Sequence, residues 1–307
     1  MLKYISVQEA AKSWNISDRR VRMLCANSKI PGTIKEGRAY RIPADAIKPV
    51  DERTLKGKEI PTKYEELFKR IDAKKAELEK RRPLTQGELE RLREEFLLEF
   101  TYNSNAIEGN TLTLQETAMV LQGITIDKKP LKEHLEAVGH KDAFQYIQQL
   151  VLENVDLSEK IIKDVHSLVL IDRPQDRGVY RRIPVRILGA KAEPPQPYLV
   201  GPKMEELIRN YSSIDNKLHD IEKVARFHLD FEGTHPFIDG NGRTGRLVLN
   251  LELMKRGYPP ISVKFTDRKN YYECFHDYTE KDDPSKMIIM VSEYIEHQLD
   301  RYLLILQ

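Results

Sequence analysis

The stretch from His235 to Arg246 reads His-Pro-Phe-Ile-Asp-Gly-Asn-Gly-Arg-Thr-Gly-Arg, and it decides how the chain is interpreted. It combines an imidazole, a carboxylate, an amide, three glycines and two guanidinium groups. Glycines allow a backbone to approach a phosphate closely and to point its N–H groups at it. The residues that follow have apolar side chains at helical spacing, and a helix that begins after glycines offers free N–H groups to an anion. The stretch therefore predicts an anion-binding site at a helix N-terminus.

Four side chains of this stretch have chemistry beyond that of the backbone. Asp239 is a candidate ligand for Mg²⁺, which prefers one or two carboxylates together with phosphate oxygens. Arg243 and Arg246 are three residues apart, so we expect them on one helical face, where they can bind further phosphates. His235 is a candidate general base for a hydroxyl nucleophile. The alternative interpretation is a glycine-rich helix entry with a buried histidine and surface arginines.

The stretch resembles the signature of the Fic-domain family, His-Pro-Phe-x-x-Gly-Asn-Gly-Arg-x-x-Arg with an acidic residue before the first glycine. The resemblance implies a mainly α-helical fold, a Fic-type helical bundle with a small β-hairpin flap. It also implies an adenylyltransferase that moves AMP from ATP, with Mg²⁺ as cofactor, to a Tyr, Ser or Thr hydroxyl of a target protein or of the chain itself. The residues implied to contact the nucleotide are Asp239, Gly240, Asn241, Gly242, Arg243, Thr244, Gly245 and Arg246.

A second motif, Ser104-Asn-Ala-Ile-Glu-Gly109, follows a helix that we expect to run through Phe100. It is similar to the family's inhibitory motif, Ser/Thr-x-x-x-Glu-Gly/Asn. A carboxylate at Glu108 that pairs with Arg246 would withdraw a phosphate-binding guanidinium and place negative charge at the γ-phosphate position. The resemblance thus implies autoinhibition, in the subclass whose inhibitory helix lies N-terminal to the catalytic core. An ordinary helix end is the alternative.

Two further segments are similar to parts of the family's nucleotide site. Residues 178–189 form the most extended pattern of the second half of the chain and resemble the flap, a hairpin that pairs with an extended target segment. The residues expected at its turn, close to the nucleotide, are Leu188, Gly189, Ala190 and Lys191. Tyr271 and Tyr272 resemble residues that contact the adenine side, with core packing as the alternative.

The first fifty residues differ from the rest in charge. They hold ten Lys and Arg against four Asp and Glu, a balance of +6, so the remainder must sum to −4 because the whole chain is +2. Two short helical patterns followed by two extended runs resemble a winged helix-turn-helix of the MerR and excisionase type. This resemblance implies DNA binding through Arg19, Arg20, Arg22, Arg38 and Arg41. A protein-docking module is the alternative.

The pattern of prolines, charges and helix signals predicts how the chain is divided. We expect a winged helix-turn-helix-like domain over 1–50 and a linker over 51–63. A helical region that carries the inhibitory helix (104–109) follows over 64–152, and the Fic catalytic core over 153–307.

Composition and missing motifs narrow the classes of function. Mean hydropathy is −0.55, and the two cysteines, Cys25 and Cys274, are too few for a disulfide framework or a cysteine zinc site, which favours a reducing cytoplasm. The sequence lacks a P-loop and the protein-kinase signatures. Removal of AMP by the same site and a DNA-bound, nucleotide-sensing transcriptional regulator remain as alternatives. The target protein, the preferred base, the DNA sequence and whether the chain forms a homo-oligomer are left open.

Overall fold

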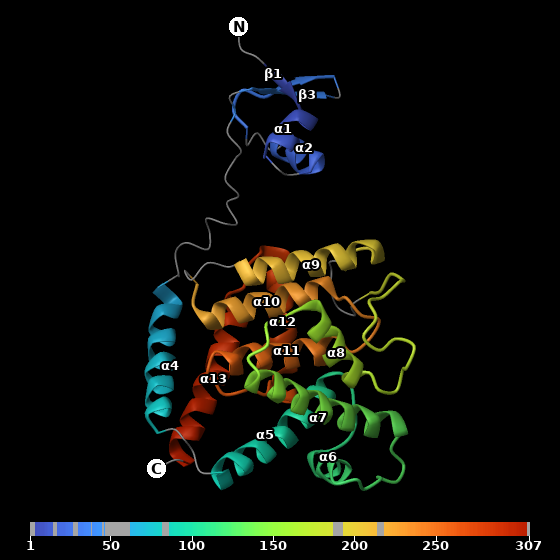
Figure 1. Cartoon of the computed structure of the whole chain (residues 1–307), viewed down its shortest axis with the longest axis vertical. Coiled ribbons are helices and arrows are strands. Elements are labelled where there is room, and N and C mark those ends of the chain that lie inside the picture. Colours follow the sequence, from blue (N-terminus) through green and yellow to red (C-terminus); the bar gives the residue numbers. More distant parts are fainter. Residues whose placement is uncertain are drawn as a thin grey trace. The chain divides into compact units, whose positions relative to one another are not determined.

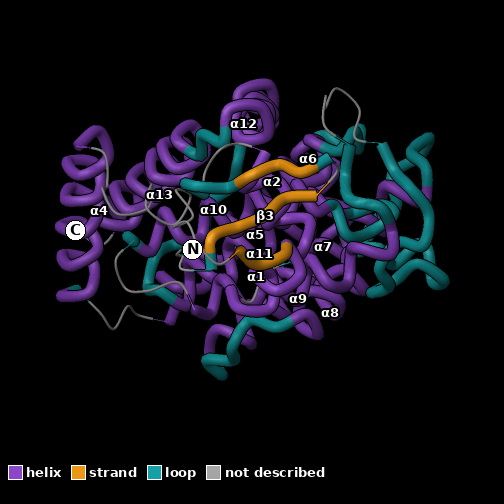
Figure 2. The backbone as a smooth tube through the Cα atoms, turned by 90° about the horizontal axis from the view of Figure 1, so that it is seen from above, coloured by secondary structure: helices purple, strands orange, loops and turns teal. Residues whose placement is uncertain are grey.

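The computed structural model forms two compact units, Met1–Glu59 and Ile60–Gln307 (Figure 1). Figure 2 shows that, in the part of the chain that is described, strands are confined to the smaller unit, whereas the larger one consists of helices and loops. The residues that the structure describes are 4–14, 17–26, 30–37, 39–44, 46, 62–81, 86–186, 193–213 and 218–305.

The smaller unit packs two helices against a three-stranded antiparallel sheet of order β1-β3-β2. Ser6 and Glu9 form a reciprocal capping box at the start of its first helix, and the second of the two expected helical patterns is the helix Asp18–Ala26. Its buried core is Val7, Ala10, Ala11, Val21, Cys25, Ile30 and Ile42. Its elements are β1 (Tyr4–Ser6), α1 (Val7–Trp14), α2 (Asp18–Ala26), β2 (Ile34–Glu36) and β3 (Ala39–Pro43).

The larger unit is built around α10 and α11, which pack on each other. Helix α9 lies along α10, α7 and α8 lie on the other side of α11, and α4 runs beside α13 (Figure 1). None of the helices in the described ranges is long and apolar enough to cross a membrane. The elements are α4 (Thr62–Lys80), α5 (Gln86–Ile107), α6 (Leu114–Leu121), α7 (Leu131–Leu152), α8 (Glu159–Val169), α9 (Pro197–Ser213), α10 (Asp220–Thr234), α11 (Asn241–Lys255), the 3₁₀ turn η1 (Phe265–Asp267), α12 (Arg268–Lys281) and α13 (Ser285–Ile305).

Helix α5 is longer than its sequence predicts, since it continues past Phe100 to Ile107. Asparagine side chains usually compete with the helical backbone, which favours an earlier end. Here Asn103 Nδ2 donates to Glu99 O and to Ser262 Oγ, and Asn105 Nδ2 donates to Thr101 O. These bonds engage both amides without breaking the helix. Residues 104–107 therefore form the last turn of α5, and Glu108 and Gly109 follow in the turn directly after it, so the motif is not a separate helix.

The prediction of an extended flap hairpin is wrong for the part of it that the structure describes. Residues 178–186 contain no strand, and the remainder of the expected hairpin, 187–192, lies outside the described residues. The segment is instead held by single contacts, because Arg181 N donates to Pro236 O and the Arg181 guanidinium to His235 O and Pro195 O. Residues that favour an extended backbone form a strand only when a partner strand satisfies their N–H and C=O groups.

Candidate active site

The loop between α10 and α11 is fixed by its own polar groups. His235, the residue after α10, and Gly240, the residue before α11, both have left-handed backbones, with φ of 47° and 75°. Asn241 closes the loop, since its side chain accepts from Phe237 N and donates to Phe237 O, both at 2.9 Å. The loop therefore presents the N-terminus of α11, with its free N–H groups, beside His235.

The His235 imidazole is neutral at physiological pH. Burial lowers its pKa to about 4, and the nearby Arg181 cation acts in the same direction. Arg181 itself is buried, with its Nε donating to His235 O at 2.8 Å. A neutral imidazole is the form that can accept a proton.

His166, on α8, packs against the α10–α11 loop and stabilises it. Its sequence context did not reveal this role. Its ring stacks on Phe237 at 3.6 Å, with an angle of 4° between the planes. Gly178 N donates to its Nδ1, so Nε2 carries the hydrogen and donates to Asp239 O at 2.9 Å. Burial lowers its pKa to about 4, which keeps this neutral tautomer.

The last turn of α5 meets α11 at Arg246. Ser104 Oγ accepts from Arg246 Nε at 3.0 Å, and Ser104 O accepts from Arg246 NH2 at 2.8 Å. Glu108 Oε1 accepts from the same NH2 at 2.8 Å, across 138 positions of sequence. Burial lowers the pKa of Arg246, but the Glu108 charge, together with Tyr271 and the hydrogen bonds to both residues, raises that pKa overall. A Cβ at Gly242 would collide with the Glu108 carboxylate, so this glycine permits the close approach.

Arg243 lies between two carboxylates. Its NH1 is 3.3 Å from Glu136 Oε1, and its NH2 is 3.5 Å from Asp239 Oδ1. Its side chain is only 2% exposed. Buried guanidinium groups normally have every N–H satisfied, because an unpaired buried donor is costly.

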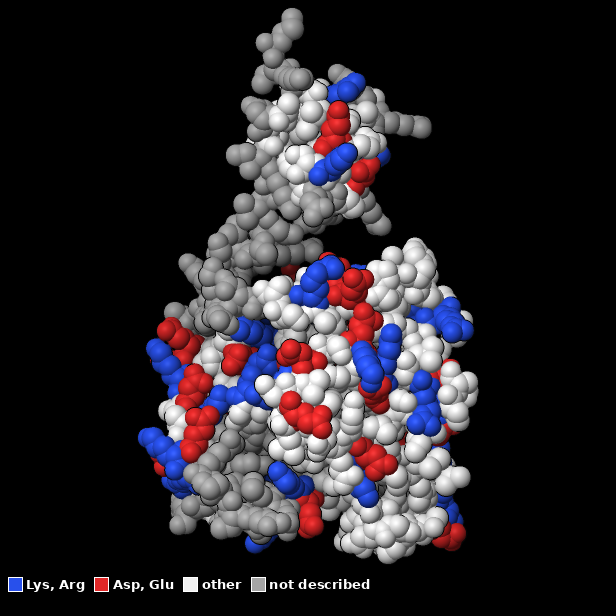
Figure 3. All heavy atoms as spheres, viewed as in Figure 1, with Lys and Arg blue, Asp and Glu red and all other residues white. Residues whose placement is uncertain are grey.

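Several donors of this site have no hydrogen-bond partner among the described residues. They are buried and lie on the first two turns of α11: Arg243 Nε, Arg246 NH1, the Thr244 hydroxyl, and Arg243 NH1, whose contact with Glu136 is an ion pair without hydrogen-bond geometry. Figure 3 shows Lys and Arg interspersed with Asp and Glu over the visible surface of the larger unit. The two buried arginines of α11 differ from that surface in having unsatisfied N–H groups, which is the pattern of an anion site.

The Asp239 carboxylate is partly exposed, with 33% of its side chain accessible, as is that of Glu108. One of its oxygens accepts from Gly240 N at 2.6 Å, and the other is 3.7 Å from Arg173 NH2. Within the described ranges no cluster of three or more His, Cys, Asp or Glu residues is suited to a metal ion. An accessible carboxylate next to an anion site, such as that of Asp239, fits Mg²⁺, which binds through few protein ligands and substrate phosphates.

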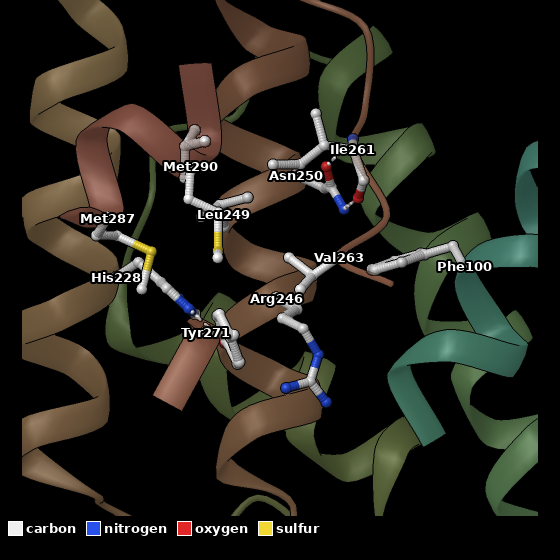
Figure 4. A pocket seen from close by; sticks show the side chains of 11 residues that line it. Phe100, His228, Arg246, Leu249, Asn250, Ile261, Val263, Tyr271, Met287 and Met290 are labelled. Atoms are coloured by element: carbon white, nitrogen blue, oxygen red, sulfur yellow. Dashed lines mark hydrogen bonds between the residues drawn. The ribbon is translucent and has the colours of Figure 1, made fainter. Parts of the chain in front are cut away.

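The two tyrosines have different environments. Tyr271 is buried, its hydroxyl is 2.7 Å from His228 Nε2, and its ring lies 5.7 Å from the Arg246 guanidinium carbon. Figure 4 shows Tyr271 and His228 beside a cavity of about 10 Å³, behind Arg246. Tyr272 is 47% exposed, and its hydroxyl donates to Ile107 O at 3.2 Å. Tyr271 therefore packs behind Arg246, and Tyr272 is the accessible one of the pair.

Glu232 is a second carboxyl group at the site that sequence reasoning missed. Its Oε1 is buried without a hydrogen-bond partner in the described part of the chain, and a Cβ at Gly245 would collide with it. Burial raises its pKa to about 8, and the negative charge of Glu108 adds to the increase. Glu232 is therefore largely protonated at neutral pH.

The expected flap residues Leu188, Gly189, Ala190 and Lys191 lie outside the described residues. The described site thus brings together residues from α5, the α10–α11 loop, α11 and α12. A neutral imidazole, an exposed carboxylate and a pair of buried arginines at a helix N-terminus define a helical protein that is suited to handle phosphates.

Residues 156–253 match the model of the Fic/DOC family. Residues 156–253 of the chain therefore form a Fic domain. Relatives include the protein adenylyltransferase Fic of Drosophila yakuba, 32% identical over 264 residues, which are 85% of this chain and 50% of that protein. The protein of the same name from Nematostella vectensis is 32% identical over 83% of this chain and 61% of its own length. The chain spans about half the length of the Drosophila relatives that it matches.

Solved structures agree on the fold. A Fic-domain-containing signaling protein from Bacteroides thetaiotaomicron superposes with a TM-score of 0.71 at 28% identity, over 77% of this chain and 96% of that one. Fic-1 from C. elegans superposes with a TM-score of 0.69, also at 28% identity, over 82% of this chain and 74% of that one. The larger unit therefore has the mainly helical Fic fold.

Proposed function

We propose that this chain is a protein adenylyltransferase that transfers AMP from ATP to a hydroxyl group of a protein. The observation that carries the proposal is the pair of buried arginines, Arg243 and Arg246, with unsatisfied N–H groups at the N-terminus of α11 and the neutral His235 beside them. The relatives named protein adenylyltransferase Fic support the choice of AMP as the transferred group.

In the proposed reaction the target hydroxyl oxygen forms a bond to the α-phosphorus of ATP. The bond from that phosphorus to the bridging oxygen breaks, and pyrophosphate leaves. The hydroxyl proton goes to the His235 imidazole. The N–H groups of Asn241 and Gly242 stabilise charge at the α-phosphate, and the two arginines hold the β- and γ-phosphates.

Mg²⁺ fits this proposal through Asp239, a partly exposed carboxylate next to the anion site. When bound there, the ion supplies charge neutralisation for the phosphates of ATP. The intact Gly240 and Gly242 favour AMP transfer over phosphate transfer, because family members that phosphorylate replace glycines of this element.

We propose that Glu108 is an autoinhibitory group, which puts the chain in the subclass with an N-terminal inhibitory helix. The support is its 2.8 Å pairing with Arg246 and its position over Gly242, where it competes with a phosphate. ATP bound beside this carboxylate would have its α-phosphate misaligned, and misplacement by about 1 Å costs on the order of 10²-fold in rate.

Removal of AMP from a modified protein is the second candidate. The observation in its favour is that the Glu108 carboxylate, one third exposed, lies at the anion site itself, where it can orient a water molecule. Incubation of AMP-modified protein with the wild-type chain and with Glu108→Gln decides this point. Release of AMP by the wild type and not by the variant supports removal.

The smaller unit is proposed to be a winged helix-turn-helix that binds DNA. Its two helices and three-stranded sheet support this, and Arg22 and Arg41 are exposed. The side chains of Arg19, Arg20 and Arg38 lie outside the described residues. The division into 1–50, 51–63, 64–152 and 153–307, and self-association of the chain, are likewise proposals.

Label transfer tests the proposed function. The wild type and Glu108→Gly are incubated with Mg²⁺ and ATP labelled at the α- or the γ-phosphate, and the protein is separated from free nucleotide. AMP transfer predicts protein-bound label from α-labelled ATP only. Label from γ-labelled ATP would identify a phosphotransferase, and absence of both would favour a nucleotide-sensing regulator.

A further inference from the structure

The Glu136 carboxylate on α7 connects the phosphate site with the end of α5. Its Oε1 is 3.3 Å from Arg243 NH1, and its Oε2 accepts from Asn110 Nδ2 at 2.9 Å. The Glu136 side chain is only 10% exposed. Two oxygens of one buried carboxylate are thus shared between an arginine of the anion site and the residue two positions after Glu108.

Asn110 is tightly fixed by these contacts. Its Nδ2 also donates to Glu133 O at 3.1 Å, and its Oδ1 accepts from Leu112 N at 3.0 Å. Its backbone N donates to Asn105 O at 3.1 Å, which ties it to the last turn of α5. Asn105 Nδ2 in turn reaches Glu136 O at 3.4 Å. The turn that carries Glu108 is therefore bound to α7 through amide groups on both sides.

Of the two carboxylates beside Arg243, that of Asp239 has other partners as well, so Glu136 is the more important counter-ion of Arg243. Asp239 already accepts from Gly240 N and lies near Arg173. Lys132 is 3.6 Å from Glu136 Oε1, but its side chain is half exposed, so solvent screens its charge. Glu136 is therefore the buried counter-ion that orients the Arg243 guanidinium.

We propose that Glu136 is a positioning residue that couples autoinhibition to nucleotide binding. It holds Arg243 in the orientation that binds a phosphate, and through Asn110 it holds the last turn of α5 so that Glu108 stays on Arg246. The proposal rests on the proposed function, since it concerns the regulation of that same site. It predicts that the two roles can be separated by substitutions that change one hydrogen bond at a time.

Three variants separate the roles. Asn110→Asp keeps the oxygen that accepts from Leu112 N, but it loses the donor and places a carboxylate against Glu136. Glu136→Gln keeps an oxygen that can accept from Asn110, but it removes the charge opposite Arg243. The double variant, Asn110→Asp with Glu136→Gln, restores a hydrogen bond with donor and acceptor exchanged, and it does not restore the charge.

Automodification rate and the KM for ATP are measured for each variant, with thermal melting as a control for folding. Asn110→Asp is expected to increase automodification about tenfold with little change in KM, as for loss of a hydrogen bond to a charged group. Glu136→Gln is expected to raise the KM for ATP about tenfold without a gain in automodification. The double variant is expected to lose the gain and to keep the raised KM.

Glu108→Gly, prepared in parallel, distinguishes two ways to fail. If Glu108→Gly is activated and Asn110→Asp is not, the coupling is wrong while the proposed inhibition stands. If the double variant keeps the full gain, the effect of Asn110→Asp does not pass through Glu136, and the proposal is also wrong. If neither Glu108→Gly nor Asn110→Asp activates the chain, the proposed inhibition is refuted, and the coupling is refuted with it.

Discussion

The first turns of α11 and the last turn of α5 meet at Arg246, and they differ in how their polar groups are satisfied. On α11, Arg243 Nε and Arg246 NH1 are buried without hydrogen-bond partners within the described ranges. At the C-terminal end of α5, Ser104 Oγ, Ser104 O and, one residue past the helix, Glu108 Oε1 all accept from Arg246. The N-terminus of α11, the positive end of its dipole, is thus left open for an anion. The C-terminal end of α5 supplies an anion of the protein itself, the Glu108 carboxylate.

The carboxylates beside the two arginines explain how a phosphate site can stay folded without its ligand. A buried guanidinium that lacks a counter-ion costs several kcal/mol, on the order expected for an unpaired buried charge. Glu108 offsets that cost for Arg246, and Glu136 does so for Arg243. The same contacts that stabilise the site therefore compete with the phosphates of a nucleotide.

The largest expected effect lies on the α10–α11 side. His235→Ala should lower AMP transfer by roughly 10²–10⁴, the usual effect of removing a general base, while ATP binding stays largely intact. The reason is that the imidazole acts on the target hydroxyl and contributes little to holding phosphate. Single-turnover transfer and a calorimetric titration with ATP measure the two properties. Transfer within about tenfold of the wild-type rate would contradict the assignment.

The pairing of Arg246 with the end of α5 leads us to expect that Arg246→Ala does not activate the chain. The substitution removes the partner of Glu108 and a phosphate ligand together, so it should stay on the order of 10²-fold slower than Glu108→Gly. The double variant should be equally slow. Initial rates at saturating ATP make the comparison, with thermal melting as a control for folding. An Arg246→Ala chain as active as Glu108→Gly would show that Arg246 binds no phosphate.

Glu232 lies near both α11 and Glu108, and its raised pKa predicts a pH dependence of stability. Because that pKa is raised from 4.5 to about 8, the folded state retains a proton that the unfolded state releases within this window. This contribution to stability is fully present below pH 4.5 and is lost as the pH rises through about 8.

Denaturant unfolding between pH 5 and pH 8 tests this expectation with Glu232→Gln as the matched control. The free energy of unfolding of the wild type should fall relative to the variant, by up to about 1.4 kcal/mol per pH unit. Parallel curves for the two proteins would show that Glu232 is ionised in the folded chain, which the burial of its carboxyl group argues against.

The smallest expected effect on catalysis comes from deleting residues 1–50. These residues belong to a separate compact unit, and the groups around Arg246 all lie in the other one. Transfer rates should therefore be unchanged, whereas salt-sensitive binding to duplex DNA should disappear with the basic residues. A deleted chain that binds DNA as well as the full one would remove the DNA-binding proposal for this unit.

Local rules account for what the sequence predicts well. The helix of 18–26 and the helix after Gly242 follow from capping, glycine and spacing signals within a few residues. Such signals cannot reveal Glu136 or Glu232, because their importance arises only when α7 and α10 pack against α11. The extension of α5 was likewise missed, since it depends on the Asn103 contact with Ser262, 159 positions away.

The flap shows the opposite error. The extended pattern over 178–189 predicted a flap hairpin, but residues 178–186 contain no strand, since a strand requires a partner and this segment is held by Arg181 instead. Tyr271 and Tyr272 illustrate an ambiguity that only packing resolves. Helical spacing cannot say which of two adjacent tyrosines is buried, and here it is Tyr271, behind Arg246.

The rate of AMP incorporation from α-labelled ATP, compared between the wild type and Glu108→Gly with Mg²⁺ and saturating ATP, tests the central claim most directly. Removal of the carboxylate frees the guanidinium that it contacts at 2.8 Å and clears the position over Gly242. The predicted result is an increase in automodification on the order of 10²-fold, the cost of a misplaced reacting group. Equal rates for the two proteins would contradict the account, because Ser104–Gly109 would then be an ordinary helix end.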